Sequence, residues 1–320
     1  MKEIDVIIPV YKPDKAFFTL IDKLENQTVP VSKIILMNTE QKYFDRLIYG
    51  TPFSEKYGNI YVTHLSKKEF NHGDTRNRGV KKSEAPIFVM MTQDAVPADE
   101  YLLENLIRPL EKKENAVSYA RQLPVEGCNE MERFTRAFNY PEMSMEKSSK
   151  DIEKLGIKTF FCSNVCAAYK REVFDMLGGF VKHTIFNEDM IYAAGAIKAG
   201  YSIAYAAEAK VIHSHNYTCM QQFRRNFDLG VSHAKHSEIF SLVTSEKEGF
   251  SLLKKMTVHL WKEGYRRTIP AFYVNSIYRY AGFCLGKHFK KLPAKLIAKF
   301  TMNKEYWEQD KRINSGIKFR

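Results

Sequence analysis

The first two-thirds of the chain alternates short apolar runs with amphipathic stretches, and this alternation limits the fold more than any other feature. The apolar runs lie at residues 5–10, 33–38, 60–65 and 87–91, with helix-like spacing between most of them. Alternating strands and helices are typical of βαβ units, which build a mostly parallel sheet. The run at 87–91 is apolar throughout, as in a strand buried on both faces. We therefore predict an α/β fold whose sheet is flanked by helices.

The same patterns predict the other elements up to residue 212. In the helix expected at 13–27, Phe17, Leu20, Ile21 and Leu24 share one face. Residues 140–158 are polar and show no clear periodicity, so we expect them to form a mobile loop that covers the functional site of the domain. Further helices are expected at 41–49, from 74 or 75 to 82, and at 99–110, 130–139, 171–177 and 189–199, and further strands at 116–121, 165–169, 203–206 and 209–212.

The excess positive charge lies in the last quarter of the chain. The formal net charge of the chain is +12, and residues 247–320 hold 17 Lys or Arg against 5 Asp or Glu. The formal net charge of the preceding residues is therefore zero. Aromatic residues alternate with the basic ones there, at Trp261, Tyr265, Phe272, Tyr273, Tyr278, Tyr280, Phe283 and Phe289. We expect a catalytic domain at 1–240 and a basic, aromatic-rich helical extension at 241–320.

Such an extension suits an anionic partner, either nucleic acid or a membrane surface. Alternatively, its aromatic residues pack against the catalytic domain or against a second subunit of a homo-oligomer. The five cysteines include no CxxC pair, which indicates neither a zinc site nor a disulfide framework. The chain has no apolar run of 18 residues, and its first residues pass directly into a strand pattern, so we expect a cytoplasmic protein.

Asp94 follows the apolar run at 87–91 and is therefore expected at the carboxyl end of a central strand. Ligands of open α/β sheets bind at such ends, where a carboxylate can share a divalent cation with substrate phosphates. Arg76 stands near a helix start, where free N–H groups and the guanidinium both suit phosphate. The residues alone predict a metal-assisted site for a phosphorylated substrate. The alternative is that Asp94 caps a turn before the helix near residue 99.

Four segments resemble the inverting glycosyltransferases of family 2, which have the GT-A fold. They are IDVIIPVYK at 4–12, HGDTRNRG at 72–79, TQDA at 92–95 and FNEDMIYAAGAIKAGY at 186–201. Three features together are similar to the rhamnosyltransferase branch of that family, which uses dTDP-L-rhamnose. They are the FNHG and TRN loop, the TQDA form of the metal motif, and HSHNYT with FRRNFDLGVSH at 213–233.

The resemblance implies the following roles. Asp189 is the candidate general base, and Glu188 orients the acceptor or shares that role. The alternative is that both are only the acidic first turn of a helix. Asp94, helped by His213 or His215, would hold Mg²⁺ or Mn²⁺, and imidazole suits Mn²⁺ better. Acceptor contacts fall on Ser163 and Asn164, and donor contacts on Pro9, Tyr11, Asn38, Glu40, Arg76, Gln93 and one of Arg224 and Arg225, the other facing outward.

The chain departs from the family pattern at two places. Thr92 stands where the metal motif usually has its first carboxylate, so metal binding by Asp94 alone is weaker or needs another ligand. The turn after the second strand reads Met37-Asn38-Thr39-Glu40 where the family usually has an aspartate-rich turn, which puts base recognition by Asn38 or Glu40 in question.

The expected function is inverting transfer of L-rhamnose from dTDP-L-rhamnose to a saccharide or polyprenyl-diphosphate-linked acceptor in cell-envelope polysaccharide synthesis. This places the enzyme at the inner face of the cell membrane, which favours an anionic membrane over nucleic acid as the partner of the extension. The alternatives are a transferase using a UDP-sugar and a non-catalytic nucleotide-sugar-binding scaffold. VYKPDK follows the first strand, where a nucleotidyltransferase or a dinucleotide-dependent dehydrogenase would have a glycine-rich loop.

Overall fold

The structure is a computed structural model that describes residues 3–215, 217–241 and 246–309. The chain divides into two compact units. The first comprises Met1–Gly127, Asn139–Lys182 and Glu188–Ser214, and the second comprises Cys128–Phe138, His183–Asn187 and His215–Arg320. We expected a boundary between two domains at residue 240, and that domain boundary stays a prediction.

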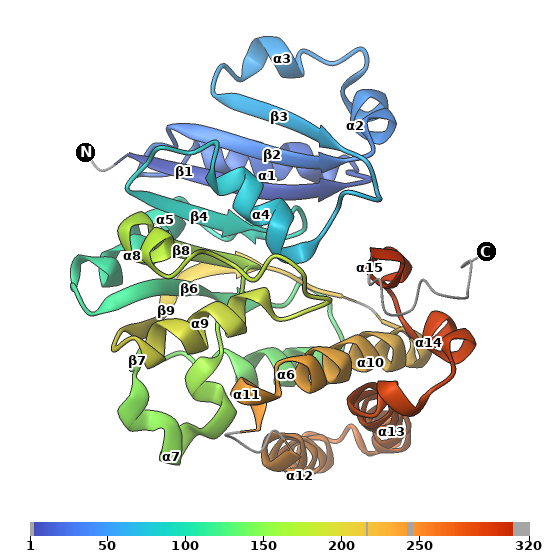
Figure 1. Ribbon diagram of the computed structural model, residues 1–320. Helices are drawn as coiled ribbons and strands as arrows, with labels where there is room; N and C mark the ends of the chain where they lie inside the picture. Colours follow the sequence, from blue (N-terminus) through green and yellow to red (C-terminus); the bar gives the residue numbers. More distant parts are fainter. Residues whose placement is uncertain (1–2, 216, 242–245, 310–320) are drawn as a thin grey trace. The chain divides into compact units, whose positions relative to one another are not determined.

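The first unit contains the sheet, and the predicted α/β architecture is confirmed. The strand order is β3-β2-β1-β4-β8-β6-β9-β5, with β7 paired to β9. The half formed by β3, β2, β1 and β4 is parallel throughout, as Figure 1 shows, and β8 is antiparallel to both β4 and β6. The strands are β1 (Ile4–Tyr11), β2 (Lys33–Thr39), β3 (Ile60–Leu65), β4 (Ile87–Met91), β5 (Val96–Pro97), β6 (Asn115–Leu123), β7 (Met145–Lys147), β8 (Cys166–Lys170) and β9 (Ser202–Ile212).

Helices cover both faces of the parallel half because its strands are apolar on both sides. Phe17 and Leu20 of α1 pack with Val6 and Ile8 of β1. On the opposite face α4 lies against β1, so closely that a Cβ at Gly79 would be 2.5 Å from Ile7 Cγ2. The helices of this unit are α1 (Ala16–Glu25), α2 (Gln41–Ile48), α3 (Phe53–Lys56), α4 (His72–Val80), α5 (Leu102–Ile107), α7 (Ile152–Leu155), α8 (Arg171–Met176) and α9 (Glu188–Lys198). Short 3₁₀ turns lie at Arg108–Glu111, Ser149–Asp151 and Gly156–Phe160.

Three local predictions are wrong. Helix α4 begins at His72, because Asn71 rather than Asp74 or Thr75 caps it by accepting from Gly73 N. The two strands expected at 203–206 and 209–212 are one strand, β9, whose pairing with β6 is irregular around the intervening residues. The segment 140–158, expected as a loop, contains β7, a 3₁₀ turn, all of α7 and the first residues of a second 3₁₀ turn.

The second unit is built from helices, as expected for the C-terminal part of the chain. Phe227, Val231, Tyr306 and Trp307 form its main core. Its elements are α6 (Glu130–Asn139, with the last residue in the first unit), α10 (Cys219–Lys235), α11 (Ser237–Phe240), α12 (Glu246–Lys262), α13 (Ile269–Lys287), α14 (Ala294–Phe300) and α15 (Lys304–Gln309), with 3₁₀ turns at Arg266–Thr268 and Phe289–Lys291. Among the described helices of the chain, none combines the length and the apolarity needed to span a bilayer.

Candidate functional site

The carboxyl ends of β1 and β4 adjoin at the point where the strand order changes direction. Open α/β sheets bind ligands at such a point. Gln93, just after β4, joins the two ends. Its Oε1 accepts from Tyr11 N at 2.8 Å and its Nε2 donates to Tyr11 O at 2.9 Å. Pro9 lies within β1 and is half-buried. The structure thus brings Tyr11 and Gln93 together, and donor binding by these residues stays a prediction.

The end of β2 carries Asn38 and Glu40. Asn38 is fully buried, and its Nδ2 lies 2.9 Å from His64 Nδ1. Glu40 lies in the left-handed region at φ 65°, and its Oε1 accepts from Lys67 N at 2.9 Å. Residues other than glycine rarely adopt this backbone conformation, and those that do are often found at functional sites. Among the described residues, Lys12 and Asn187 are the other non-glycine residues with positive φ, and they adjoin Tyr11 and Glu188.

Asp94 and His213 lie together in the first unit. The Asp94 side chain is 44% exposed, and its Oδ2 is 3.5 Å from Nε2 of the buried His213. Their side chains have the spacing of metal ligands. The third predicted metal residue, His215, is the first residue of the second unit, and its ligand role stays a prediction. Carboxylate oxygen with imidazole nitrogen suits Mn²⁺, so the residues fit a divalent cation. Thr92 Oγ1 is buried and has no hydrogen-bond partner among the described residues.

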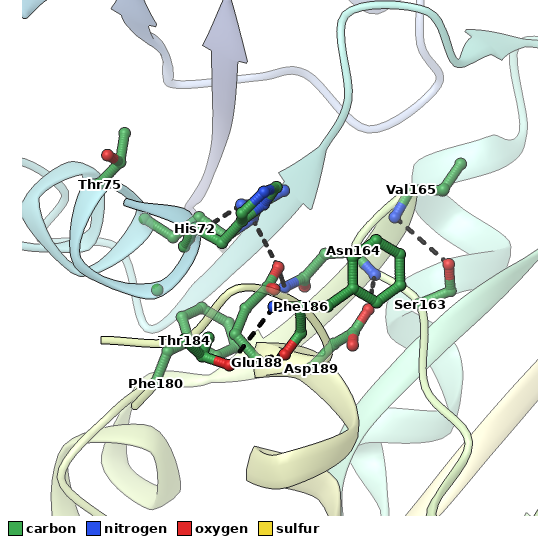
Figure 2. A network of polar contacts seen from close by, with 12 residues as sticks. His72, Thr75, Ser163, Asn164, Val165, Phe180, Thr184, Phe186, Glu188 and Asp189 are labelled. Atoms are coloured by element: carbon green, nitrogen blue, oxygen red, sulfur yellow. Dashed lines mark hydrogen bonds and ion pairs between the residues drawn. The ribbon is translucent and has the colours of Figure 1, made fainter. Parts of the chain in front are cut away.

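Asn164 holds both acidic residues at the start of α9 (Figure 2). Its backbone N–H donates to Asp189 Oδ2 at 2.9 Å, and its Nδ2 donates to Glu188 Oε1 at 3.1 Å. The Asn164 amide oxygen in turn accepts from Tyr169 Oη at 2.7 Å. Asn164 was expected to contact the acceptor, and here it fixes two carboxylates. One residue therefore sets the orientation of the predicted base and its neighbour.

Arg76 pairs with Glu188 instead of standing free for a phosphate. Its Nε is 3.3 Å from Glu188 Oε1, with both side chains more than nine-tenths buried, and its Nη1 donates to His72 O at 2.9 Å. The contribution of Arg76 to donor binding stays a prediction. Separating a buried ion pair is costly, because it leaves a charge uncompensated away from water. The pair therefore holds α4 and the start of α9 together.

Neighbouring charges drive the two carboxyl groups of α9 in opposite directions. Burial raises the pKa of Asp189, and the charge of Glu188 raises it further, to about 7. Burial also works against ionisation of Glu188, but Arg76, His72 and the Asn164 amide outweigh it and hold the pKa of Glu188 below its ordinary value. Around neutral pH the site therefore holds an ionised Glu188 beside an Asp189 that can take up a proton.

The remaining predicted residues divide between the two units. Ser163 is buried, and its Oγ accepts from Gln122 Nε2 at 3.0 Å. Arg224 and Arg225 lie on α10 in the second unit, where the Arg225 guanidinium is 4.7 Å from the centre of the Phe186 ring. The sequence patterns did not single out Gln122, because a lone glutamine near a strand end carries no motif. Only the contacts between distant segments reveal it.

Comparison with known proteins agrees with this architecture. The model of the family described as Glycosyl transferase family 2 matches residues 5–178. The O-antigen chain rhamnosyltransferase RfbN of Salmonella typhimurium is 39% identical, over 95% of this chain and 96% of its own length. The O-antigen chain rhamnosyltransferase WbaN of Salmonella anatum is 39% identical, over 96% of each chain.

Two solved glycosyltransferase structures share the fold. The mannosyltransferase PcManGT from Pyrobaculum calidifontis, in complex with GDP-Man and Mn²⁺, superposes with a TM-score of 0.61 at 14% identity, over 91% of this chain and 88% of its own. S. aureus TarS 1–349, in complex with UDP-GlcNAc, gives a TM-score of 0.50 at 14% identity, over 89% and 90%. The predicted GT-A fold is confirmed.

Proposed function

We propose that this chain, which belongs to Glycosyl transferase family 2, transfers L-rhamnose from dTDP-L-rhamnose to a saccharide acceptor with inversion at the anomeric carbon. Membership of the family makes the chain a glycosyltransferase, and its 39% identical relatives are O-antigen rhamnosyltransferases. The choice of dTDP as the carrier rests on the sequence motifs. The mechanism rests on one observation, the placement of the Asp189 carboxyl group at the start of α9, where Asn164 holds it beside Glu188.

Asp189 acts as the general base in this proposal. Its carboxylate takes the proton of the acceptor hydroxyl while that oxygen forms a bond to the anomeric carbon and the bond to the departing diphosphate breaks. A base whose pKa lies near the working pH combines a useful ionised fraction with a strong affinity for the proton. The pKa of Asp189 is about 7, which meets this requirement near neutral pH. Backbone N–H groups fix both carboxylate oxygens, since Asn164 N donates to Oδ2 at 2.9 Å and Met190 N donates to Oδ1 at 2.8 Å. Each oxygen has a second lone pair that can take the proton of the acceptor.

Glu188 tunes the base and is not a second base. Arg76 keeps Glu188 ionised, and the charge of Glu188 helps to raise the pKa of Asp189. Replacing Glu188 by a neutral residue would therefore lower that pKa and weaken the base. In this assignment Arg76 acts on catalysis through Glu188.

Asp94 and His213 fit a divalent cation, with His215 as a further candidate. When bound, such a cation supplies positive charge that stabilises the departing diphosphate. Asp94 contributes a partly exposed carboxylate, and His213 contributes a buried imidazole. Gln93, which follows β4, holds the end of β1 by bonding both backbone groups of Tyr11.

A donor screen tests this function. Purified protein would be heated with a panel of nucleotide sugars, each with and without Mn²⁺, because a ligand that binds the native state raises its stability. We expect the largest Mn²⁺-dependent shift with dTDP-L-rhamnose, and loss of that metal dependence in Asp94→Ala. Preference for a UDP-sugar would overturn the rhamnose assignment. Binding without transfer to any saccharide or lipid-linked acceptor would instead support a scaffold.

We also propose that the enzyme acts at an anionic membrane surface on a polyprenyl-diphosphate-linked acceptor. The support is the charge of residues 247–320, where 17 basic residues stand against 5 acidic ones. Each basic residue near an anionic surface contributes about 1 kcal/mol. Vesicle binding that weakens as salt rises is the expected behaviour.

A further inference from the structure

Three buried polar side chains form a continuous chain between the two halves of the predicted site. Gln122, near the end of β6, is 3% exposed, and it lies between Ser163 and His213, which are 9% and 5% exposed. Its Nε2 donates to Ser163 Oγ at 3.0 Å, and its Oε1 is 2.9 Å from His213 Nδ1. His213 Nε2 in turn faces Asp94 Oδ2 at 3.5 Å. All four residues belong to the first unit.

This arrangement determines which nitrogen of His213 can bind a cation. An amide oxygen only accepts hydrogen bonds, so the nitrogen that faces it must carry the proton. With the proton on Nδ1, the neutral ring keeps its lone pair on Nε2, the atom on the side of Asp94. A histidine that ligates a metal usually donates its other N–H to such an acceptor, which fixes the tautomer and the ring orientation.

We propose that Gln122 is a positioning residue that holds His213 in the tautomer needed for metal binding. The inference rests on the metal role of Asp94 and His213 in the proposed function, and it adds a buried residue that acts through His213 and Ser163. The same amide also holds Ser163, next to Asn164, which bonds to Asp189 and Glu188. Gln122 therefore fixes side chains on the metal side and on the acceptor side of the site together.

Two substitutions of Gln122 distinguish the proposed positioning of His213 from a role in packing alone. Gln122→Leu removes the acceptor for His213 Nδ1–H. We expect it to weaken Mn²⁺ binding about 10- to 100-fold, the usual effect of losing such a partner. Gln122→Glu retains an acceptor, so its Mn²⁺ affinity should stay within about threefold of the unaltered protein.

Gln27→Leu is the matched control for the loss of a buried amide. Gln27 is also buried in the first unit, where its amide donates to Lys23 O and Asp99 O and accepts from Leu103 N. Deleting this amide should lower the melting temperature and leave Mn²⁺ affinity unchanged. The probe is Mn²⁺ alone, titrated into the full-length protein, with the free ion measured by electron paramagnetic resonance.

A second readout is the ¹⁵N chemical shift of the His213 ring, which distinguishes the two neutral tautomers. We expect the proton on Nδ1 in the unaltered protein and in Gln122→Glu, and a mixture of tautomers in Gln122→Leu. Equal Mn²⁺ affinity in Gln122→Leu and the unaltered protein would overturn the inference. An equal loss of Mn²⁺ affinity in Gln122→Leu and Gln122→Glu would overturn it as well. Unchanged Mn²⁺ affinity in Asp94→Ala would show instead that the metal part of the proposed function has failed.

Discussion

At the scale of single residues, two adjacent carboxyl groups are given different chemistry by different neighbours. Glu188 has a buried arginine 3.3 Å away, whereas Asp189 receives hydrogen bonds mainly from backbone N–H groups and lies beside the charge of Glu188. Burial acts on both groups, but Arg76 is paired with Glu188, and its effect on the pKa of Asp189 is smaller than the opposing effect of the Glu188 charge. The division of labour therefore comes from one ion pair, which the sequence Asn187-Glu188-Asp189 does not disclose.

We expect the rate of transfer to follow the ionisation of Asp189. At subsaturating substrates, kcat/KM should rise with pH through an apparent pKa of about 7, because the ionised carboxylate is the base. Asp189→Asn should abolish transfer and retain donor binding, which thermal shift can measure separately. A profile that is flat between pH 5 and pH 8, or full activity in Asp189→Asn, would contradict the assignment.

Stability offers an independent check of the same pKa. The pKa of Asp189 is raised from its ordinary 3.8 to about 7, so the native state binds a proton that the unfolded chain has already released between these values. The carboxyl group therefore lowers the free energy of unfolding as pH rises through this window, with its full cost above pH 7. The gain in melting temperature of Asp189→Asn over the unaltered protein should accordingly be larger at pH 8 than at pH 5.

The candidate site residues that the sequence indicates are those with a strong local signal. Asp94 follows a buried strand, Asp189 opens a helix, and His213 follows the last strand, so their positions could be predicted. Their partners could not, because Gln122 meets His213 across 91 residues of chain. Hydrogen bonds of this kind depend on register between distant strands, and one residue of slip would remove them.

At the scale of elements, periodicity predicted most strands and helices, and tertiary contacts decided the rest. Ile60–Leu65 and Ile87–Met91 have the predicted bounds, because runs of apolar and β-branched residues leave little choice. β7 was missed because it is three residues long and exposed at two of them. Its third residue, Lys147, is buried and donates from Nζ to Tyr119 Oη and to the carbonyl oxygens of Lys158 and Phe161. A buried lysine held in this way has no signature in the sequence.

Glycines allow α10 and α13 to pack closely in the second unit. A Cβ at Gly286 would lie 2.1 Å from Phe227 O, and one at Gly282 would lie 2.2 Å from Phe223 O. Backbone atoms cannot move aside as a flexible side chain can. Gly286→Ala should therefore force the helices apart and lower the free energy of unfolding by about 1–3 kcal/mol, the usual cost of overpacking. Urea denaturation measures this change.

Gly249→Ala is the matched control for this helix contact. Gly249 lies in α12 with nothing near the place of its Cβ, so alanine should raise stability by about 0.5–1 kcal/mol through helix propensity. Equal effects of the two substitutions, in either direction, would show that close packing of α10 and α13 is not the reason for Gly286.

At the scale of the whole molecule, the charge and the exposed apolar surface of the C-terminal part coincide. Nine of the twenty large apolar side chains that are exposed in the described part of the chain fall within residues 250–280. Of the eight tail aromatics named from the sequence, Phe272 and Phe289 are buried and Phe283 is half-buried, whereas Trp261, Tyr265, Tyr273, Tyr278 and Tyr280 are exposed. Burial in the core of the unit accounts for the first group. The exposed side chains reach the surface, as the membrane proposal requires.

The exposed residues lie on defined faces of α12 and α13. Phe250, Val258 and Trp261 share one face of α12, opposite the side where Met256 and Leu260 are buried. Ile277 is 64% exposed on α13, and the two faces adjoin where Thr257 Oγ1 donates to Tyr273 Oη at 3.2 Å. Amphipathic helices with basic and aromatic residues bind membranes by inserting their apolar face below the headgroups. We therefore expect binding to need both the charge and this apolar face.

The double variant Trp261→Glu with Ile277→Glu tests this expectation without removing the core of the second unit. Placing two carboxylates at the apolar face should weaken binding to phosphatidylglycerol-containing vesicles by at least about tenfold, since each lost apolar insertion is worth about 1.5–3 kcal/mol. Tyr49→Glu, at a side chain 89% exposed in the first unit, is the control and should bind as the unaltered protein does. Co-sedimentation at low and high salt measures both contributions, because salt screens only the charges.

Unchanged vesicle binding of the double variant would contradict the proposal that the apolar face inserts into the membrane. If the unaltered protein is a dimer, the double variant is a monomer and neither protein binds vesicles, the apolar face is instead the contact with a second copy of the chain.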